Sequence, residues 1–175
     1  MESPSRWRHL RAIGPLPGMV AVVVPALLAL AYGTNVGWGL ASPAGALPVL
    51  AGVLPIAAGL RLIWETISLF GSVGKGTLAP WDPTTRLVVE GPYRRVRNPM
   101  ISGVGAVLMG EAALLGSVPI LIEFAVFATV NAIYIPLFEE PGLERRFGEE
   151  YREYKRRVPR WIPRSGAKLS AASGD

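Results

Sequence analysis

Basic side chains gather where an apolar stretch of the sequence begins. Arg94, Arg95 and Arg97 directly precede Asn98 and Pro99. Asparagine suits the N-cap of a helix and proline its first turn, so the sequence predicts a helix start here. A helix N-terminus beside arginines favours a carboxylate or phosphate, through free N–H groups and positive charge. The alternative is a membrane anchor, in which the same arginines contact lipid phosphates.

Two acidic residues form the second candidate site. Glu139 and Glu140 stand where the last apolar stretch ends. The sequence predicts a helix C-terminus here, and negative charge at that end opposes the helix dipole. The carboxylates therefore need a partner, which Arg94, Arg95 or Arg97 could supply. Such a contact is either an ion pair that pins the loop or part of a cup for a polar ligand.

A third set of charges lies inside the apolar sequence. Arg61 and Glu65 are four residues apart, so they can pair on one helix face. Charges within a membrane span are functional candidates by default. An arginine could orient the carboxylate of a ligand, and a glutamate could accept a proton from an amine. A mutually neutralised pair near the interface explains them equally well, and Glu111 and Glu123 rank lower because we expect them near the outer surface.

Several other chemistries are disfavoured by what the chain lacks. There are no cysteines, which excludes a disulfide framework, a thiolate metal site and a cysteine nucleophile. The single histidine, His9, does not suffice for a histidine-based zinc site, so no metal is expected. No Rossmann glycine fingerprint, P-loop or HExxH motif is present. A net charge of +5 could suggest nucleic acid, but basic cytoplasmic loops facing anionic lipid headgroups explain it, so no nucleic-acid partner is expected.

Long apolar stretches must position these groups. Residues 16–32 and 44–70 are each long enough to span a bilayer, and residues 100–138 are long enough to cross twice with a break at 116–119. A signal peptide at 16–32 is disfavoured, because it would be shorter and carry a clear cleavage site. The sequence thus predicts an all-α polytopic membrane bundle of about four transmembrane helices, with a C-terminal cytoplasmic amphipathic helix.

The distribution of Lys and Arg predicts the orientation of this multi-pass integral membrane protein. Residues 33–43 and 116–119 contain neither, whereas the N-terminus, residues 71–99 and the segment after 138 are basic. By the positive-inside rule, four crossings place all three basic segments, and both termini, in the cytoplasm.

The C-terminal segment has the pattern of an amphipathic helix. Its apolar stripe consists of Leu143, Phe147, Tyr151, Tyr154 and Val158. We expect one helix that lies along the interface or folds back on the bundle, followed by an interfacial anchor at Arg160 and Trp161. Residues 164–175 are expected to form a disordered tail. The chain therefore divides into residues 1–70, 71–163 and 164–175.

Two motifs together resemble a known family. Residues 91–103 match the pattern G-P-Y-x-x-x-R-[HN]-P-x-x-x-G, and residues 139–154 match E-E-x-x-L-x-x-x-F-G-x-x-Y-x-x-Y, with a closing V-P-R at 158–160. Both resemble the membrane methyltransferases that include isoprenylcysteine carboxyl methyltransferases and phospholipid N-methyltransferases. The resemblance covers residues 74–163, about half of the chain.

This resemblance implies S-adenosylmethionine as cofactor, bound on the cytosolic side, and a membrane lipid or other hydrophobic acceptor that enters from the bilayer. The accepting group is a carboxylate, amine or thiol. Carried over by position, the cofactor-binding residues are Gly91, Tyr93, Arg97, Asn98, Pro99, Gly103, Glu139 and Glu140, closed by Tyr151, Tyr154 and Arg157. The catalytic candidates are Arg61, Glu65 and Glu140. Many relatives have His in place of Asn98 and Tyr in place of Ile101, which leaves the acceptor open.

Two other functions fit parts of the sequence. A membrane reductase that uses NADPH can share the Arg-[HN]-Pro hairpin. A non-enzymatic adaptor would use its basic face to bind lipid or a partner, and its loop arginines would matter only collectively. The oligomeric state is not predicted by the sequence.

Overall fold

The computed structural model describes residues 14–39, 43–72 and 87–163. The regular secondary structure of these residues is helical, and there is no strand among them. The predicted tail at 164–175, the N-terminal Arg6, Arg8, Arg11 and His9, and the loop residues Lys75 and Arg86 lie outside the described residues. The main helices are α2 (Val24–Tyr32), α3 (Ala46–Ser72), α4 (Pro99–Leu115), α5 (Val118–Tyr134), α6 (Glu140–Phe147) and α7 (Glu149–Arg157). A π-helical segment, Gly14–Val23, leads into α2, and 3₁₀ turns occupy Val36–Gly39, Pro43–Gly45 and Gly91–Arg94.

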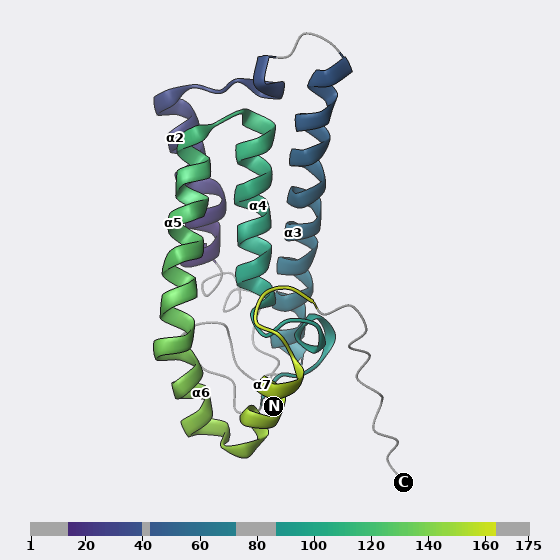
Figure 1. Cartoon of the computed structure of the whole chain (residues 1–175), viewed down its shortest axis with the longest axis vertical. Coiled ribbons are helices and arrows are strands. Elements are labelled where there is room, and N and C mark those ends of the chain that lie inside the picture. The colour runs from purple at the N-terminus through teal and green to yellow at the C-terminus, as the bar shows by residue number, and fades with distance from the viewer. Residues whose placement is uncertain (1–13, 40–42, 73–86, 164–175) are drawn as a thin grey trace.

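Apolar helices make the chain an integral membrane protein. Three helical stretches are long and apolar enough to cross a bilayer, namely Pro17–Gly39, Pro43–Leu69 and Val118–Phe147. The fourth apolar helix, α4, is shorter and lies between α3 and α5 (Figure 1). Its buried Val104, Val107 and Leu108 form the centre of the bundle. The predicted all-α membrane bundle is confirmed.

The predicted helical hairpin is also confirmed. Helix α4 ends at Gly116, whose φ of 57° is the left-handed conformation that glycine adopts without strain. Ser117 then caps α5, with its hydroxyl accepting from the Ile120 N–H at 3.5 Å. We call this end of the bundle the turn end. The opposite end, where α3 finishes, α4 begins and α6 and α7 lie, is called the charged end.

The connection between α2 and α3 covers the turn end. The Asn35 N–H donates to the Leu115 carbonyl at 2.7 Å, and the Trp38 indole N–H donates to the Ala113 carbonyl at 3.0 Å. The last carbonyls of a helix have no partner within the helix. These two donors therefore satisfy the end of α4 from outside it.

Helices α3 and α4 approach each other through paired glycines. A methyl group added to Gly59 would lie 2.5 Å from the Gly103 carbonyl oxygen, and one added to Gly110 would lie 2.6 Å from the Gly52 carbonyl oxygen. The glycines are seven residues apart on each antiparallel helix, so the two pairs repeat the same contact. Small residues allow this backbone approach, which increases van der Waals packing between membrane helices.

Two expectations about the C-terminal region are wrong. The helix of the last crossing does not end at Glu139, because a π-type turn, Ile135–Glu139, accommodates Pro136 and leads directly into α6. The amphipathic segment is not one helix either. Gly148, with a φ of 57°, breaks it into α6 and α7.

The broken C-terminal region folds back on the segment that precedes α4. Its apolar stripe still converges, because Tyr151, Tyr154 and Val158 form a buried cluster against Leu87, Leu143 and Phe147. Backbone contacts close the arrangement, with the N–H of Arg97 donating to the Pro159 carbonyl at 2.9 Å and the N–H of Asn98 donating to the Arg160 carbonyl at 3.3 Å. Of the two expected positions, folding back is the one observed.

Candidate functional site

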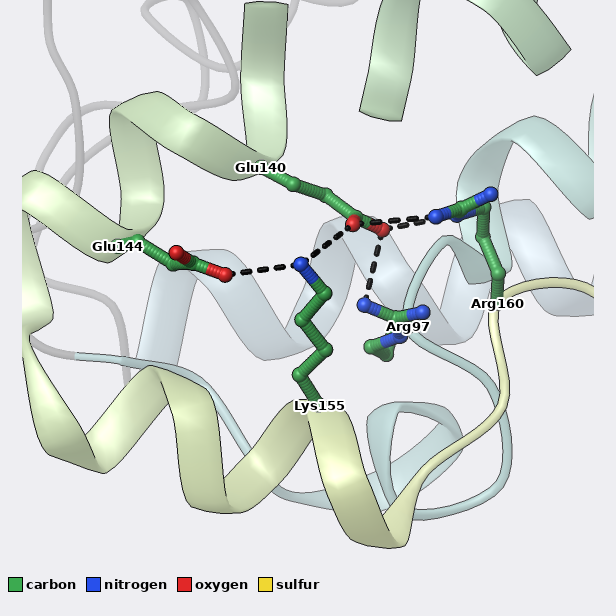
Figure 2. A network of polar contacts seen from close by, with 5 residues as sticks. All are labelled: Arg97, Glu140, Glu144, Lys155 and Arg160. Carbon is green, nitrogen blue, oxygen red and sulfur yellow. Dashed lines mark hydrogen bonds and ion pairs between the residues drawn. The ribbon is translucent and has the colours of Figure 1, made fainter. Parts of the chain in front are cut away.

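Glu140 is the centre of an ion-pair cluster at the charged end. Its side chain, at the start of α6, is only 3% exposed. Arg97 Nη1 lies 2.8 Å from Glu140 Oε1, and Lys155 Nζ lies 3.3 Å from Oε2. Arg160 forms two hydrogen bonds, from Nε to Oε1 at 2.8 Å and from Nη2 to Oε2 at 3.1 Å. One carboxylate thus joins three segments of the chain (Figure 2).

The cluster carries more positive than negative charge. Glu144 is its second carboxylate and accepts from Lys155 at 2.8 Å (Figure 2). The hydrogen bond to Glu144 is the largest cause that raises the pKa of Lys155, with contributions from Glu140, and the hydrogen bond to Glu140 raises the pKa of Arg160. Both bases therefore stay charged, so three cations face two carboxylates. The cluster can accept one further anionic group.

Three buried side-chain atoms of Arg97 and Ser102 have no hydrogen-bond partner within the described part of the chain. They are Arg97 Nε, Ser102 Oγ and Arg97 Nη1, and the last of these contacts Glu140 as an ion pair. The Arg97 side chain is 9% exposed, so it cannot satisfy the Nε donor freely with bulk water. Orphaned donors of this kind require an explanation, and a bound ligand is one.

Three tyrosines line the same region. The Tyr154 hydroxyl donates to the Tyr93 carbonyl at 2.8 Å. Burial raises the pKa of Tyr93, and Tyr154 and Glu139 add to the rise. Burial also raises the pKa of Tyr154 and of Tyr151. The phenols therefore stay protonated at physiological pH, as hydrogen-bond donors enclosed among aromatic rings.

Adjacent Glu139 and Glu140 are in different environments. Glu140 is buried and bound by three cations, whereas Glu139 is exposed and has no ion pair among the described residues. Glu139 lies near Tyr93, since its charge affects that phenol. Of the predicted arginine partners, Arg97 binds Glu140. Arg94 and Arg95 bind neither carboxylate.

The helix start at Asn98 differs from its expected form. Asn98 occupies the N-cap position of α4, with Pro99 following, but its side chain makes no capping hydrogen bond. The backbone N–H groups of Arg97 and Asn98 are taken by carbonyls of the C-terminal segment. These two groups are therefore not free to receive an anion, and positive charge at this end comes mainly from side chains.

Other predicted cofactor residues lie at the edge of the cluster or outside it. Gly103 faces α3 across the Gly59 contact, so its missing side chain is explained by helix packing. Gly91 starts the 3₁₀ turn with a φ of 54° and packs near Leu69. Arg157 is exposed and pairs with Glu153 on its own helix. The structure therefore groups Tyr93, Arg97, Glu140, Tyr151 and Tyr154.

The predicted Arg61–Glu65 pair is present on α3. Arg61 Nε donates to Glu65 Oε1 at 2.7 Å, and the side chains are 81% and 40% exposed. The Gly59–Gly103 contact places this pair level with the first turns of α4. The pair thus lies near the charged end on an outward face of α3, apart from the Glu140 cluster. A catalytic role for these two residues stays a prediction.

Reasoning from the sequence does not find three residues of the cluster, Glu144, Lys155 and Arg160. Lys155 lies on the charged side of an amphipathic stripe, and Arg160 was assigned to an interfacial anchor with Trp161. The anchor is wrong for Arg160, whose guanidinium binds Glu140. Only the closing V-P-R of the second motif pointed to it.

A comparison with protein families identifies the family of the chain. The family model of phospholipid methyltransferases matches residues 47–150, more than half of the chain. No curated protein matches the chain. The chain belongs to the phospholipid methyltransferase family. It is thus a membrane methyltransferase of a family whose substrates are lipid-like. The match includes the resemblance motif at 91–103 and both glutamates, and it ends at residue 150, in the first turn of α7, before Lys155 and Arg160.

Proposed function

We propose that the protein transfers a methyl group from S-adenosylmethionine to a lipid-like acceptor at the cytoplasmic face of the membrane. The observation that carries this proposal is the Glu140 cluster, in which both family motifs meet through Arg97 and Glu140. The acceptor is a membrane lipid or another hydrophobic molecule with a carboxylate, amine or thiol. Family membership favours this function over the NADPH-dependent reductase and over the adaptor.

The residues present suit this cofactor. When bound, S-adenosylmethionine supplies a methyl group that its sulfonium already activates. The excess positive charge of the cluster and the unpaired Arg97 Nε suit its carboxylate. The exposed carboxylate of Glu139 suits its ammonium group. Tyr93, Tyr151 and Tyr154 supply aromatic surface and protonated hydroxyls around both.

Glu140 is proposed as a positioning residue. A carboxylate bound by Arg97, Lys155 and Arg160 has little capacity to accept a proton, because three cations stabilise its charged form. It holds Arg97 in place and ties α6 to α7 and to the segment before α4. The chain then contributes alignment of donor and acceptor and exclusion of water.

The cytoplasmic assignment rests on charge. The turn end has no Lys or Arg among residues 33–39 and 116–117, whereas the charged end has Arg94, Arg95 and the basic residues of α6 and α7. The positive-inside rule favours the cytoplasm for such an end. S-adenosylmethionine is then available on the side where the cluster lies.

The test is binding of S-adenosylmethionine to the purified full chain in nanodiscs, measured by calorimetry. We expect saturable binding, and Glu139→Gln should weaken it roughly tenfold, since a charge-assisted hydrogen bond contributes about 1.5–3 kcal/mol. Phe138→Leu, which changes the neighbouring exposed side chain without changing charge, is the matched control and should leave affinity unchanged.

Two outcomes would contradict the proposal. If the wild-type protein binds NADPH but not S-adenosylmethionine in parallel titrations, the reductase alternative replaces it. If S-adenosylmethionine binds but Glu139→Gln and Phe138→Leu have equal affinities, the assignment of Glu139 is wrong and the cofactor lies elsewhere.

A further inference from the structure

The three arginines before α4 fall into two groups. Arg97 is buried and bound to Glu140. Arg94 and Arg95 are exposed and make no ion pair with any residue between 87 and 163 or in the other described segments. The three arginines thus have different roles. The Glu140 cluster explains Arg97 but does not explain Arg94 and Arg95.

Most other exposed arginines at this end are neutralised within the chain. Arg152 pairs with Glu149, and Arg156 and Arg157 pair with Glu153. Arg94 and Arg95 have no such carboxylate within the described segments. Two adjacent guanidinium groups, at the last residue of the 3₁₀ turn and at the residue that follows it, therefore present charge that no described residue compensates.

The length of α4 fixes the depth of this turn in the membrane. Helix α4 has 17 residues, which is about 25 Å at about 1.5 Å per residue. The hydrocarbon core of a bilayer is about 30 Å thick. The helix is therefore about 5 Å shorter than the core, and with its other end at the opposite boundary Pro99 lies near the boundary between hydrocarbon and headgroups. Arg95 is only four residues before Pro99, so its level is that of the lipid phosphates.

The turn is also held firmly at that level. The buried side chain of Val96 is 4% exposed and follows Arg95 directly. The Tyr154 hydroxyl binds the Tyr93 carbonyl, and Gly91 packs near Leu69 of α3. The backbone on both sides of the two arginines is therefore anchored, while their side chains project from it.

We propose that Arg94 and Arg95 bind the phosphate of an anionic phospholipid in the leaflet at the charged end. Guanidinium groups bind phosphate oxygens in pairs, with a geometry that ammonium groups do not reproduce. The occupant is a lipid headgroup, because the turn lies at headgroup depth. This contact is independent of the methyl donor.

The experiment measures lipid binding to the full chain in a zwitterionic detergent, by titration with short-chain phosphatidylglycerol followed by native mass spectrometry. We expect saturable binding to the wild type and little binding of phosphatidylcholine of the same chain length. The double variant R94Q/R95Q should lose roughly tenfold or more in affinity for phosphatidylglycerol, since each basic residue near a membrane surface contributes roughly a fivefold step. R94K/R95K, which keeps the charge, should lose less.

The matched control is R145Q/R146Q, which removes the same charge from two exposed residues of α6 at the same end. It should keep wild-type affinity. Equal losses in the two glutamine variants would overturn the proposal in favour of general charge attraction. Unchanged binding in R94Q/R95Q would also overturn it, as would full competition by inorganic phosphate at equal concentration, which would indicate a free-phosphate site.

Discussion

The α3–α4 helix pair and the Glu140 cluster hold the molecule together in opposite ways. The helix pair contains no ion pair between its two members in the described residues, and its contact is glycine against backbone. The cluster joins its segments through one carboxylate and three cations. The first arrangement tolerates no added atoms, and the second tolerates no lost charge.

This difference suits the position of each region. Within lipid there is no hydrophobic driving force between helices, so close packing must replace it. At the charged end water and headgroups can solvate ions, so ion pairs can join the segments there. Substitutions that act on only one region test whether the two are separable.

The largest expected effect comes from Glu140→Ala. Removing this carboxylate leaves Arg97 buried without its counter-charge, which typically costs about 3–5 kcal/mol. We expect the C-terminal region to detach from the segment before α4, seen as a lower thermal midpoint and faster proteolysis after residue 140. Cofactor binding should be lost with it.

Glu139→Ala is the control for this prediction. The neighbouring carboxylate is exposed and makes no ion pair among the described residues, so its removal should change stability by less than about 0.5 kcal/mol. Equal destabilisation by both substitutions would show that the cluster is not centred on Glu140.

The next largest effect concerns the helix pair. Gly59→Ala and Gly110→Ala each place a methyl group within 2.6 Å of a backbone oxygen, and such overpacking typically costs about 1–3 kcal/mol. The helices must separate, and we expect a lower unfolding midpoint in SDS titration. Gly105→Ala is the matched control, because its added carbon would meet only ordinary contact with Phe124 at 3.5 Å. If Gly105→Ala destabilises as strongly, the paired-glycine contact is not the cause.

The same comparison separates what the sequence predicts from what it does not. Hydropathy and the break at Gly116 predict the bundle and its hairpin, because membrane spans need long apolar runs and turns need special conformations. The resemblance assigns Gly103 to the cofactor site, and only the register of α3 against α4 shows that Gly103 packs against Gly59. Register depends on tertiary packing, which no local pattern contains.

The site follows the same division. The motifs identify Arg97 and Glu140, and charge compensation predicts that they meet. Lys155 and Arg160 were missed because their contacts depend on the break at Gly148 and on the chain folding back after α7. The apolar stripe predicts one continuous helix, and in such a helix Lys155 and Arg160 would lie far from Glu140.

A smaller effect is expected for Tyr154→Phe, which removes the hydrogen bond to the Tyr93 carbonyl. The cost should be about 1 kcal/mol, the typical net value of one hydrogen bond. Burial raises the pKa of Tyr154, so its contribution to stability is present below its ordinary value of 10.0 and is lost as the pH rises above it. The decline of the thermal midpoint between pH 9 and 11 should therefore be less steep in Tyr154→Phe, and an unchanged slope would refute this role of the phenol.

The smallest effect is expected at the exposed pair on the outward face of α3, which takes part neither in the glycine contact with α4 nor in the Glu140 cluster. Arg61→Gln, Glu65→Gln and the double variant form a thermodynamic cycle for the bond between Arg61 Nε and Glu65 Oε1. Exposed pairs in helices contribute about 0.3–0.5 kcal/mol, so we expect a coupling of that size in unfolding experiments.

The same variants decide whether the Arg61–Glu65 pair is structural or catalytic. For this purpose methyl transfer is measured with labelled S-adenosylmethionine and membrane lipid extract. A structural pair leaves turnover unchanged in all three variants. A loss of turnover larger than tenfold in either single variant, with stability unchanged, assigns the pair to the acceptor side of the site and would mean that the functional region extends from the Glu140 cluster to the outer face of α3.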